Sequence, residues 1–74
     1  MDFFERLRQL RKENKETQVQ TAKSVGITER QYQGLEAGTS LPNYRTFIAL
    51  ADHFGVSLDY LAGRTEDPRG GIES

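Results

Sequence analysis

The chain has 74 residues, of which 35% are hydrophobic and 28% charged, a composition typical of a globular protein rather than a disordered one. This length allows a single domain with a small core. No apolar run approaches the roughly 20 residues that cross a bilayer, and the first residues lack the basic and apolar segments of a secretory signal. The absence of cysteine excludes disulfides and thiolate metal sites. We therefore expect a cytoplasmic protein without a membrane segment.

The first expected helix covers residues 2–14. Phe3, Leu7 and Leu10 recur there at helical spacing, with Phe4 beside them. Acidic side chains lie near the start of this segment and basic ones near its end, as the helix dipole favours. The pattern predicts one amphipathic helix, followed by a short break.

The second expected helix begins with a capping signal. Thr17 and Gln20 have the spacing of a capping box, in which each side chain bonds the backbone amide of the other residue. The helix should cover residues 18–25 and end at Gly26, since glycine adopts the left-handed conformation that closes a helix. Its inward-facing residues are expected to be Val19, Ala22 and Val25.

A third expected helix repeats the same signal after a very short connection. Thr28 and Gln31 form the second capping box, and Gly38 closes the helix after about Ala37. Two short capped helices joined by about three residues that include a glycine are typical of a helix-turn-helix. The spacing therefore predicts this motif over residues 17–37.

Two further helices and a tail complete the expected order. Asn43 should cap a helix over residues 44–54, whose apolar stripe is Tyr44, Phe47, Leu50, Ala51 and Phe54. Ser57 should cap a last short helix over residues 58–62, closed by Gly63. Residues 64–74 lack periodicity, which predicts a mobile tail after a domain of residues 1–63.

Two charged residues continue apolar stripes. Arg11 lies four positions after Leu7, and Glu36 lies four positions after Tyr32. A lone buried charge costs several kcal/mol, whereas a paired one is tolerated. These two opposite charges therefore either pair with each other or lie at the edge of the core with their charged ends in water.

The ordered motifs resemble the lambda-repressor-like, Cro-type (XRE-type) helix-turn-helix family over residues 3–63. The matching stretches are residues 6–11, Thr17-Gln18, Ala22, residues 25–28, Tyr32, residues 35–38, Pro42, Leu50-Ala51 and residues 54–61. The resemblance implies an all-α domain of five helices and an ion pair between Arg11 and Glu36. It also implies sequence-specific binding of double-stranded DNA by a transcriptional regulator, with a phage- or prophage-type repressor favoured.

The resemblance implies that the third helix contacts bases in the major groove, through Glu29, Arg30 and Gly34 with Gln33 alongside. Arg30 suits guanine, Glu29 suits cytosine, and Gln33 suits adenine. Two alternatives stay open. Glu29 also stabilises a helix N-terminus, and Gly34 is either a site of close backbone approach or a tolerated glycine.

Contacts to the DNA phosphates are expected from the start of the second helix, the start of the third and the loop after it. The candidates are Lys15, Gln18, Lys23, Thr28, Gln31, Thr39 and Ser40, with Arg11 a further possibility. The loop departs from the basic loop of many family members, because no Lys or Arg lies between Arg30 and Arg45. The net charge of −1 also differs from that of a typical basic DNA-binding domain.

Catalytic, metal and cofactor sites are not expected. His53 is the single histidine, and its place beside Asp52 on a helix predicts a solvated surface residue. With one histidine and no cysteine, the usual parts of zinc and nucleophilic chemistry are missing. The sequence therefore predicts a protein that is not an enzyme.

A homodimer is expected, because one short recognition helix contacts too few bases for useful specificity. The candidate dimer residues are Ile48, Leu58 and Tyr60, although Tyr60 is equally suited to burial within the monomer. An alternative function is an antitoxin or anti-repressor-type module that binds a protein partner with the same fold. The acidic balance and the missing loop cations favour that alternative.

Overall fold

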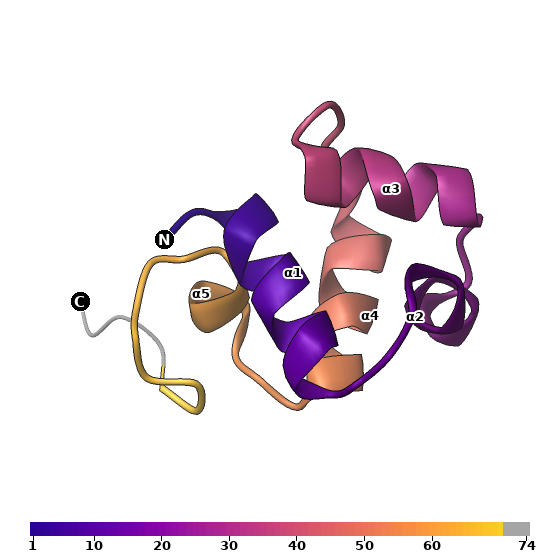
Figure 1. The fold of residues 1–74 in the computed structure, drawn as a ribbon. Helices are drawn as coiled ribbons and strands as arrows, with labels where there is room; N and C mark the ends of the chain where they lie inside the picture. Colours follow the sequence, from indigo (N-terminus) through magenta and orange to yellow (C-terminus); the bar gives the residue numbers. More distant parts are fainter. Residues whose placement is uncertain (71–74) are drawn as a thin grey trace.

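Five α-helices form the secondary structure of residues 1–70, the part of the chain that a computed structural model describes. They are α1 (Phe3–Glu13), α2 (Gln18–Val25), α3 (Glu29–Ala37), α4 (Tyr44–Phe54) and α5 (Leu58–Leu61). The predicted all-α fold of five helices is confirmed. In Figure 1, α1 crosses the middle of the view, α3 lies across the top, and α2 and α5 lie on opposite sides. Among these helices, none has the length and apolarity needed to cross a membrane.

The helices begin at polar residues whose side chains accept a backbone amide hydrogen bond. Thr17 Oγ1 accepts from the Gln20 amide at 3.1 Å, and Gln20 Oε1 accepts from the Thr17 amide at 2.8 Å. Thr28 and Gln31 form the same two bonds, at 3.0 and 2.9 Å. Both predicted capping boxes are therefore confirmed. The other three helices are capped by Asp2, Asn43 and Ser57.

The hydrophobic core lies where the five helices face one another. Its buried members are Leu7, Leu10, Ala22, Tyr32, Leu35, Leu50, Ala51, Tyr60 and Leu61. Two residues expected on inward stripes are exposed instead, Val19 to 39% and Tyr44 to 78%. Val19 lies roughly a third of a turn from the buried face of α2, where Thr21 is fully buried. Tyr44 is the first residue of α4, one turn before the residues that enter the core.

Residues 64–70, the described part of the expected tail, fold back against α5. The Ser57 amide donates to the Pro68 carbonyl oxygen at 2.7 Å, and Ser57 Oγ donates to the Gly70 carbonyl oxygen at 2.9 Å. These bonds hold the returning chain at the N-terminus of α5, where Figure 1 shows it as the yellow loop. Hydrogen bonds to the N-cap residue of α5 therefore continue beyond Gly63. Residues 71–74 of the expected tail lie outside the described residues.

Arg6 is a buried charge that the sequence analysis missed. Its side chain is 1% exposed, its guanidinium carbon lies 3.8 Å from the centre of the Tyr60 ring, and its Nη2 donates to Glu66 Oε2 at 3.0 Å. A cation over an aromatic face is attracted by the ring quadrupole. Tyr60 is thereby covered within the monomer and is 8% exposed, in agreement with the alternative of burial within the monomer.

Candidate nucleic-acid interface

A tight turn joins α2 to α3. Gly26 closes α2 with a φ of 80°, in the left-handed region that favours glycine. The Ile27 amide then donates to the Ala22 carbonyl oxygen at 3.0 Å, which folds the chain back over the end of the helix. Because Thr28 caps α3 at once, the two helices are held in the arrangement of a helix-turn-helix. Figure 1 shows α3 on the outside of the molecule.

The outer face of α3 carries the predicted base-contacting residues. Tyr32, Leu35 and Glu36 are buried and fix the inner face of the helix. Glu29, Arg30 and Gln33 are exposed on the other side, and Gly34 is half-buried. Gln33 Nε2 donates to Glu29 Oε2 at 3.4 Å across one turn. The structure thus brings the four predicted positions to one face, where Arg30 and the neighbouring polar groups reach solvent.

The loop after α3 is fastened to the carbonyl group of Gly34. The amides of Thr39 and Ser40 approach this oxygen at 3.0 and 3.3 Å, and Thr39 Oγ1 donates to it at 3.4 Å. A Cβ atom at Gly34 would stand 2.7 Å from Ser40 Oγ and 3.4 Å from Thr39 Oγ1. The space beside Gly34 is therefore occupied by side-chain hydroxyl groups of the chain's own loop.

A single carboxylate joins α1, α2 and α3. Arg11 donates to both oxygens of Glu36, from Nε to Oε2 at 2.6 Å and from Nη2 to Oε1 at 3.1 Å. Gln18 Nε2 donates to Glu36 Oε1 at 3.3 Å. The Arg11 and Glu36 side chains are 14% and 4% exposed. The two charges therefore form an ion pair below the surface, in place of the alternative in which both reach into water.

This network engages the side chains of two predicted phosphate-contacting residues, Gln18 and Arg11. The Gln18 side chain is turned toward Glu36, which leaves its backbone amide, in the first turn of α2, as the group suited to an anion. Arg11 also donates to the Glu16 carbonyl oxygen at 3.0 Å. Its guanidinium is thus occupied by internal acceptors.

The Glu36 carboxyl group has an altered pKa. Burial by itself would raise this pKa, but the hydrogen bonds from Arg11 and its neighbours outweigh burial and leave the pKa of Glu36 below its ordinary value of 4.5. Glu16 has the same balance: burial opposes ionisation, while hydrogen bonds from His53 and Thr21 lower its pKa. Burial raises the pKa of the Tyr32 hydroxyl.

We expect these carboxylates to make the domain sensitive to acid. Because the folded-state pKa of Glu36 lies below its unfolded value, its contribution is complete above the unfolded pKa and is lost as the pH falls through the folded one. The free energy of unfolding, measured with urea, should therefore fall between about pH 5 and pH 3. Glu36→Gln should flatten this dependence, and Glu13→Gln, at an exposed carboxylate outside the network, should not. Equal slopes for wild type and Glu36→Gln would contradict the prediction.

The other predicted phosphate-contacting residues form a dispersed set. Thr28 and Gln31 are engaged in their capping box, although a hydroxyl that accepts a hydrogen bond can still donate its own proton. Lys15 is exposed and has a φ of 56° in the turn before α2. Lys23 is exposed in the last turn of α2. Thr39 and Ser40 lie beside Gly34 of α3.

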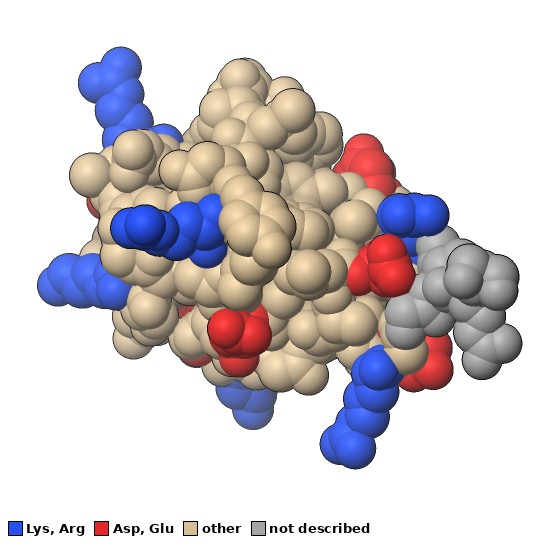
Figure 2. Space-filling view, turned by 180° about the vertical axis from the view of Figure 1, so that it is seen from behind, with Lys and Arg blue, Asp and Glu red and all other residues tan. Residues whose placement is uncertain are grey.

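The surface from α3 to the start of α4 carries no exposed charge over residues 31–44. The single charged residue in this range is Glu36, which is buried. On the face shown in Figure 2, uncharged side chains form a continuous area that extends to the top of the view. The missing loop cations are thus not replaced by basic residues of this segment.

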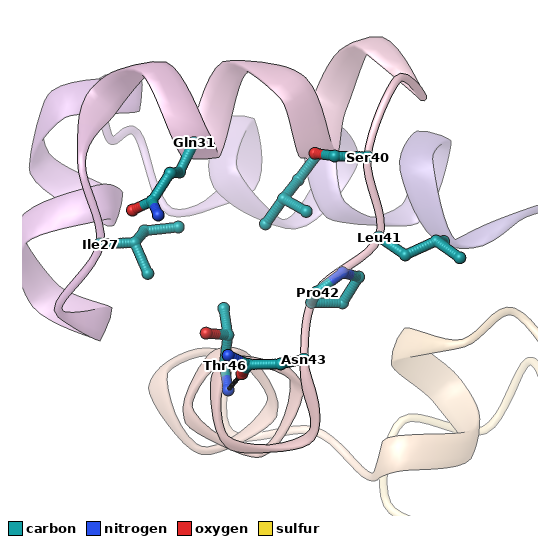
Figure 3. Close-up of a pocket in the computed structure, with 8 residues that line it drawn as sticks. Ile27, Gln31, Ser40, Leu41, Pro42, Asn43 and Thr46 are labelled. Atoms are coloured by element: carbon teal, nitrogen blue, oxygen red, sulfur yellow. Dashed lines mark hydrogen bonds between the residues drawn. The ribbon is translucent and has the colours of Figure 1, made fainter.

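A pocket of about 260 Å³ lies between α3 and α4, bordered by their connecting loop. Figure 3 shows the Ser40 hydroxyl directed back toward α3, whereas the Leu41 side chain points away from the pocket. The lining residues are Ile27, Gln31, Leu35, Ser40, Leu41, Pro42, Asn43 and Thr46.

His53 is half-buried, which corrects the prediction of a solvated side chain. Its Nε2 lies 2.8 and 3.0 Å from the two carboxylate oxygens of Glu16, and Thr21 Oγ1 donates to Glu16 Oε1 at 2.7 Å. The three side chains connect the α1–α2 turn to α2 and α4. Within residues 1–70, no group of three or more His, Cys, Asp or Glu residues is placed to hold a metal ion.

Residues 4–66 match the family described as helix-turn-helix domain, and the chain belongs to this family. It is 41% identical over 71 residues to YobD, an uncharacterized HTH-type transcriptional regulator of Bacillus subtilis, covering 96% of this chain and 63% of that protein. It is 38% identical over 64 residues to RstR, the cryptic phage CTXphi transcriptional repressor of Vibrio cholerae, covering 86% and 57%. The chain thus spans about six tenths of the length of these curated relatives.

Similar structures agree with this assignment. The P22 c2 repressor in complex with synthetic operator 9T superposes with a TM-score of 0.83 at 29% identity, covering 88% of this chain and 98% of that chain. A transcriptional regulator from Listeria innocua gives a TM-score of 0.81 at 29% identity, covering 89% and 62%. The resemblance to lambda-repressor-like domains is therefore confirmed.

Proposed function

We propose that this chain binds double-stranded DNA sequence-specifically and regulates transcription as a repressor, with α3 in the major groove. The observation that carries the proposal is the outer face of α3, which presents Arg30 between Glu29 and Gln33 on a helix fixed from below by the core. The similarity to a phage repressor and to a repressor bound to an operator supports it. The proposed activity is binding without catalysis, requires no cofactor, and implies a cytoplasmic location, where the operator DNA would be.

Distinct groups would supply base and phosphate contacts. Arg30 can donate two hydrogen bonds to guanine, while Glu29 and Gln33 suit cytosine and adenine. Lys15 and Lys23 are the exposed cations of the turn before α2 and of α2 itself, and the backbone amide of Gln18 lies at a helix N-terminus, which attracts anions. The Thr28 hydroxyl adds a neutral donor, while the capping role of Gln31 makes it the weaker candidate.

A homodimer on a two-fold symmetric operator fits the small size of the α3 surface. With Tyr60 buried, the remaining candidates for the dimer contact are Leu58, which is 40% exposed, and the half-buried Ile48. Two protomers would place two copies of α3 in successive major grooves and double the number of bases contacted.

Binding of the purified protein to the DNA upstream of its own gene tests the proposal. Two phosphate-neutralising lysines per protomer give about four per dimer, so log affinity against log salt should have a slope near −4, at roughly −0.9 per phosphate. Affinity should then fall about 150-fold between 50 and 200 mM salt. Footprinting locates the site, and a salt titration on that site measures the slope.

Two outcomes would contradict parts of this proposal. A slope near −8 would mean that a basic surface other than Lys15 and Lys23 neutralises phosphates. Absence of any binding at low salt would reject DNA binding and favour the alternative of a protein-interaction module, for which the uncharged segment of residues 31–44 is suited.

A further inference from the structure

The outer face of α3 has a gap where a helix that contacts bases would carry a side chain. Gly34 lies four residues after Arg30, one turn further along the same side of the helix. A glycine inside a helix costs stability relative to alanine. The absence of a side chain at position 34 therefore calls for a physical reason, which we seek in the groups that lie beside Gly34.

The loop after α3 fills this gap with hydroxyl groups. Ser40 Oγ stands 2.7 Å from the place of a Cβ atom at Gly34, closer than real Cβ contacts, and Thr39 Oγ1 stands 3.4 Å from it. A side chain at position 34 and the present place of the Ser40 hydroxyl therefore exclude each other. Figure 3 shows this hydroxyl turned toward α3.

The loop is held firmly enough to position such a group. The carbonyl oxygen of Gly34 lies within hydrogen-bonding distance of the Thr39 and Ser40 amides and of the Thr39 hydroxyl. The amide of Gly38, which adopts a φ of 80°, donates to the same oxygen. Groups fixed in advance lose little conformational freedom when they bind.

We propose that Ser40 is a specificity-determining residue, whose loop-borne hydroxyl takes the place of the missing side chain at Gly34 and contacts a base edge beside the one contacted by Arg30. This inference rests on the proposed DNA binding and replaces the phosphate contact expected for Ser40. A hydroxyl both donates and accepts, so it can bond any base edge. The lack of exposed charge over residues 31–44 argues against a phosphate clamp at this loop.

The test compares the DNA preferences of wild type, Ser40→Ala and Gly34→Ala, determined by selection from randomised DNA and by competition with single-base variants of the selected site. Ser24→Ala is the matched control, because this exposed serine on α2 bonds only to its own helix, at the Gln20 carbonyl oxygen. For Ser40→Ala we expect discrimination to fall about two- to tenfold at one base pair per half-site, the size of one hydrogen bond. Other positions and the salt slope should stay unchanged.

Gly34→Ala is a second, independent test of the role of Ser40. Its methyl group would displace the Ser40 hydroxyl, which can rotate away, while alanine favours the helix. We therefore expect an unchanged or higher Tm, together with altered preference at the same base pair as in Ser40→Ala. A loss of preference in a variant that folds at least as well as wild type cannot come from unfolding.

The outcomes separate this inference from the proposed function. If wild type selects no DNA sequence, sequence-specific binding itself is rejected, and the role of Ser40 with it. If wild type selects a site and Ser40→Ala selects the same site with equal discrimination, the role of Ser40 alone is rejected. Uniform weakening of Ser40→Ala on all sequences would make the hydroxyl a phosphate contact and would also overturn the inference.

Discussion

Arg11→Met should lower the free energy of unfolding by about 3–5 kcal/mol, the effect of removing one member of a buried ion pair. Glu36 is 4% exposed and accepts two hydrogen bonds from Arg11. Without this guanidinium, the carboxylate would stay below the surface with Gln18 as a neutral donor and with the half-exposed Arg8, whose Nε lies 4.0 Å from Glu36 Oε1, as its nearest cation. Most of this cost arises because the Glu36 carboxylate would stay buried without its ion-pair partner. The cost therefore exceeds the net contribution of the ion pair to stability. Urea unfolding measured by circular dichroism gives the value.

A double-mutant cycle separates the cost of leaving one charge unpaired from the stability that the ion pair itself contributes. Combined Arg11→Met and Glu36→Leu should be less destabilising than the sum of the single substitutions, because the double variant leaves neither charge unpaired. Lys12→Met, at an exposed position on the same helix, is the matched control and should change stability by less than about 0.5 kcal/mol. Additive effects within error would mean that the two residues do not stabilise each other.

Arg30→Ala should cost about 1–3 kcal/mol of binding free energy on the footprinted site and relax the preference at one base pair per half-site. Arg30 is exposed on the outer face of α3 and is not required by the core, so folding should be preserved. Competition binding against single-base operator variants measures both effects.

The pattern of loss identifies the contact that Arg30 makes. Loss confined to one base pair supports base contact, whereas uniform loss with a shallower salt slope would assign Arg30 to a phosphate. Arg69→Ala, an exposed arginine in the returning C-terminal segment, is the control and should leave affinity unchanged. No effect of Arg30→Ala would contradict the placement of α3 in the groove.

The helix order was predictable from sequence because its signals are local. Thr17 with Gln20 and Thr28 with Gln31 define the starts of α2 and α3 within one turn of chain, and Gly26 and Gly38 define their ends. Capping signals of this kind need no knowledge of how the helices pack. The two opposite charges on apolar stripes left the pairing of Arg11 with Glu36 open, and the family resemblance implied it.

The missed features depend on contacts between distant segments. Arg6 shares the apolar face of Phe3 and Leu7, which was an available signal, but its covering by Tyr60 and Glu66 requires the chain to return over residues 64–70. Charged residues are rarely buried, so helical spacing alone does not predict that Arg6 is buried.

A contact between distant segments also explains why His53 is half-buried and not solvated as the sequence predicted. Its partner Glu16 lies in the turn before α2, 37 residues away. Adjacent residues on the helix gave no indication of that contact, and spacing along one helix cannot predict a partner supplied by a turn elsewhere in the chain.

The uncharged surface over residues 31–44 also has a consequence for the kinetics of operator search. Proteins slide along DNA because phosphate attraction holds them to any sequence between their sites. Because residues 31–44 offer no exposed cation to the phosphates, this protein should leave non-operator DNA quickly and travel little along it at each encounter. It would then locate its operator mainly through repeated collisions from solution, and lengthening the DNA around the operator should accelerate association only slightly.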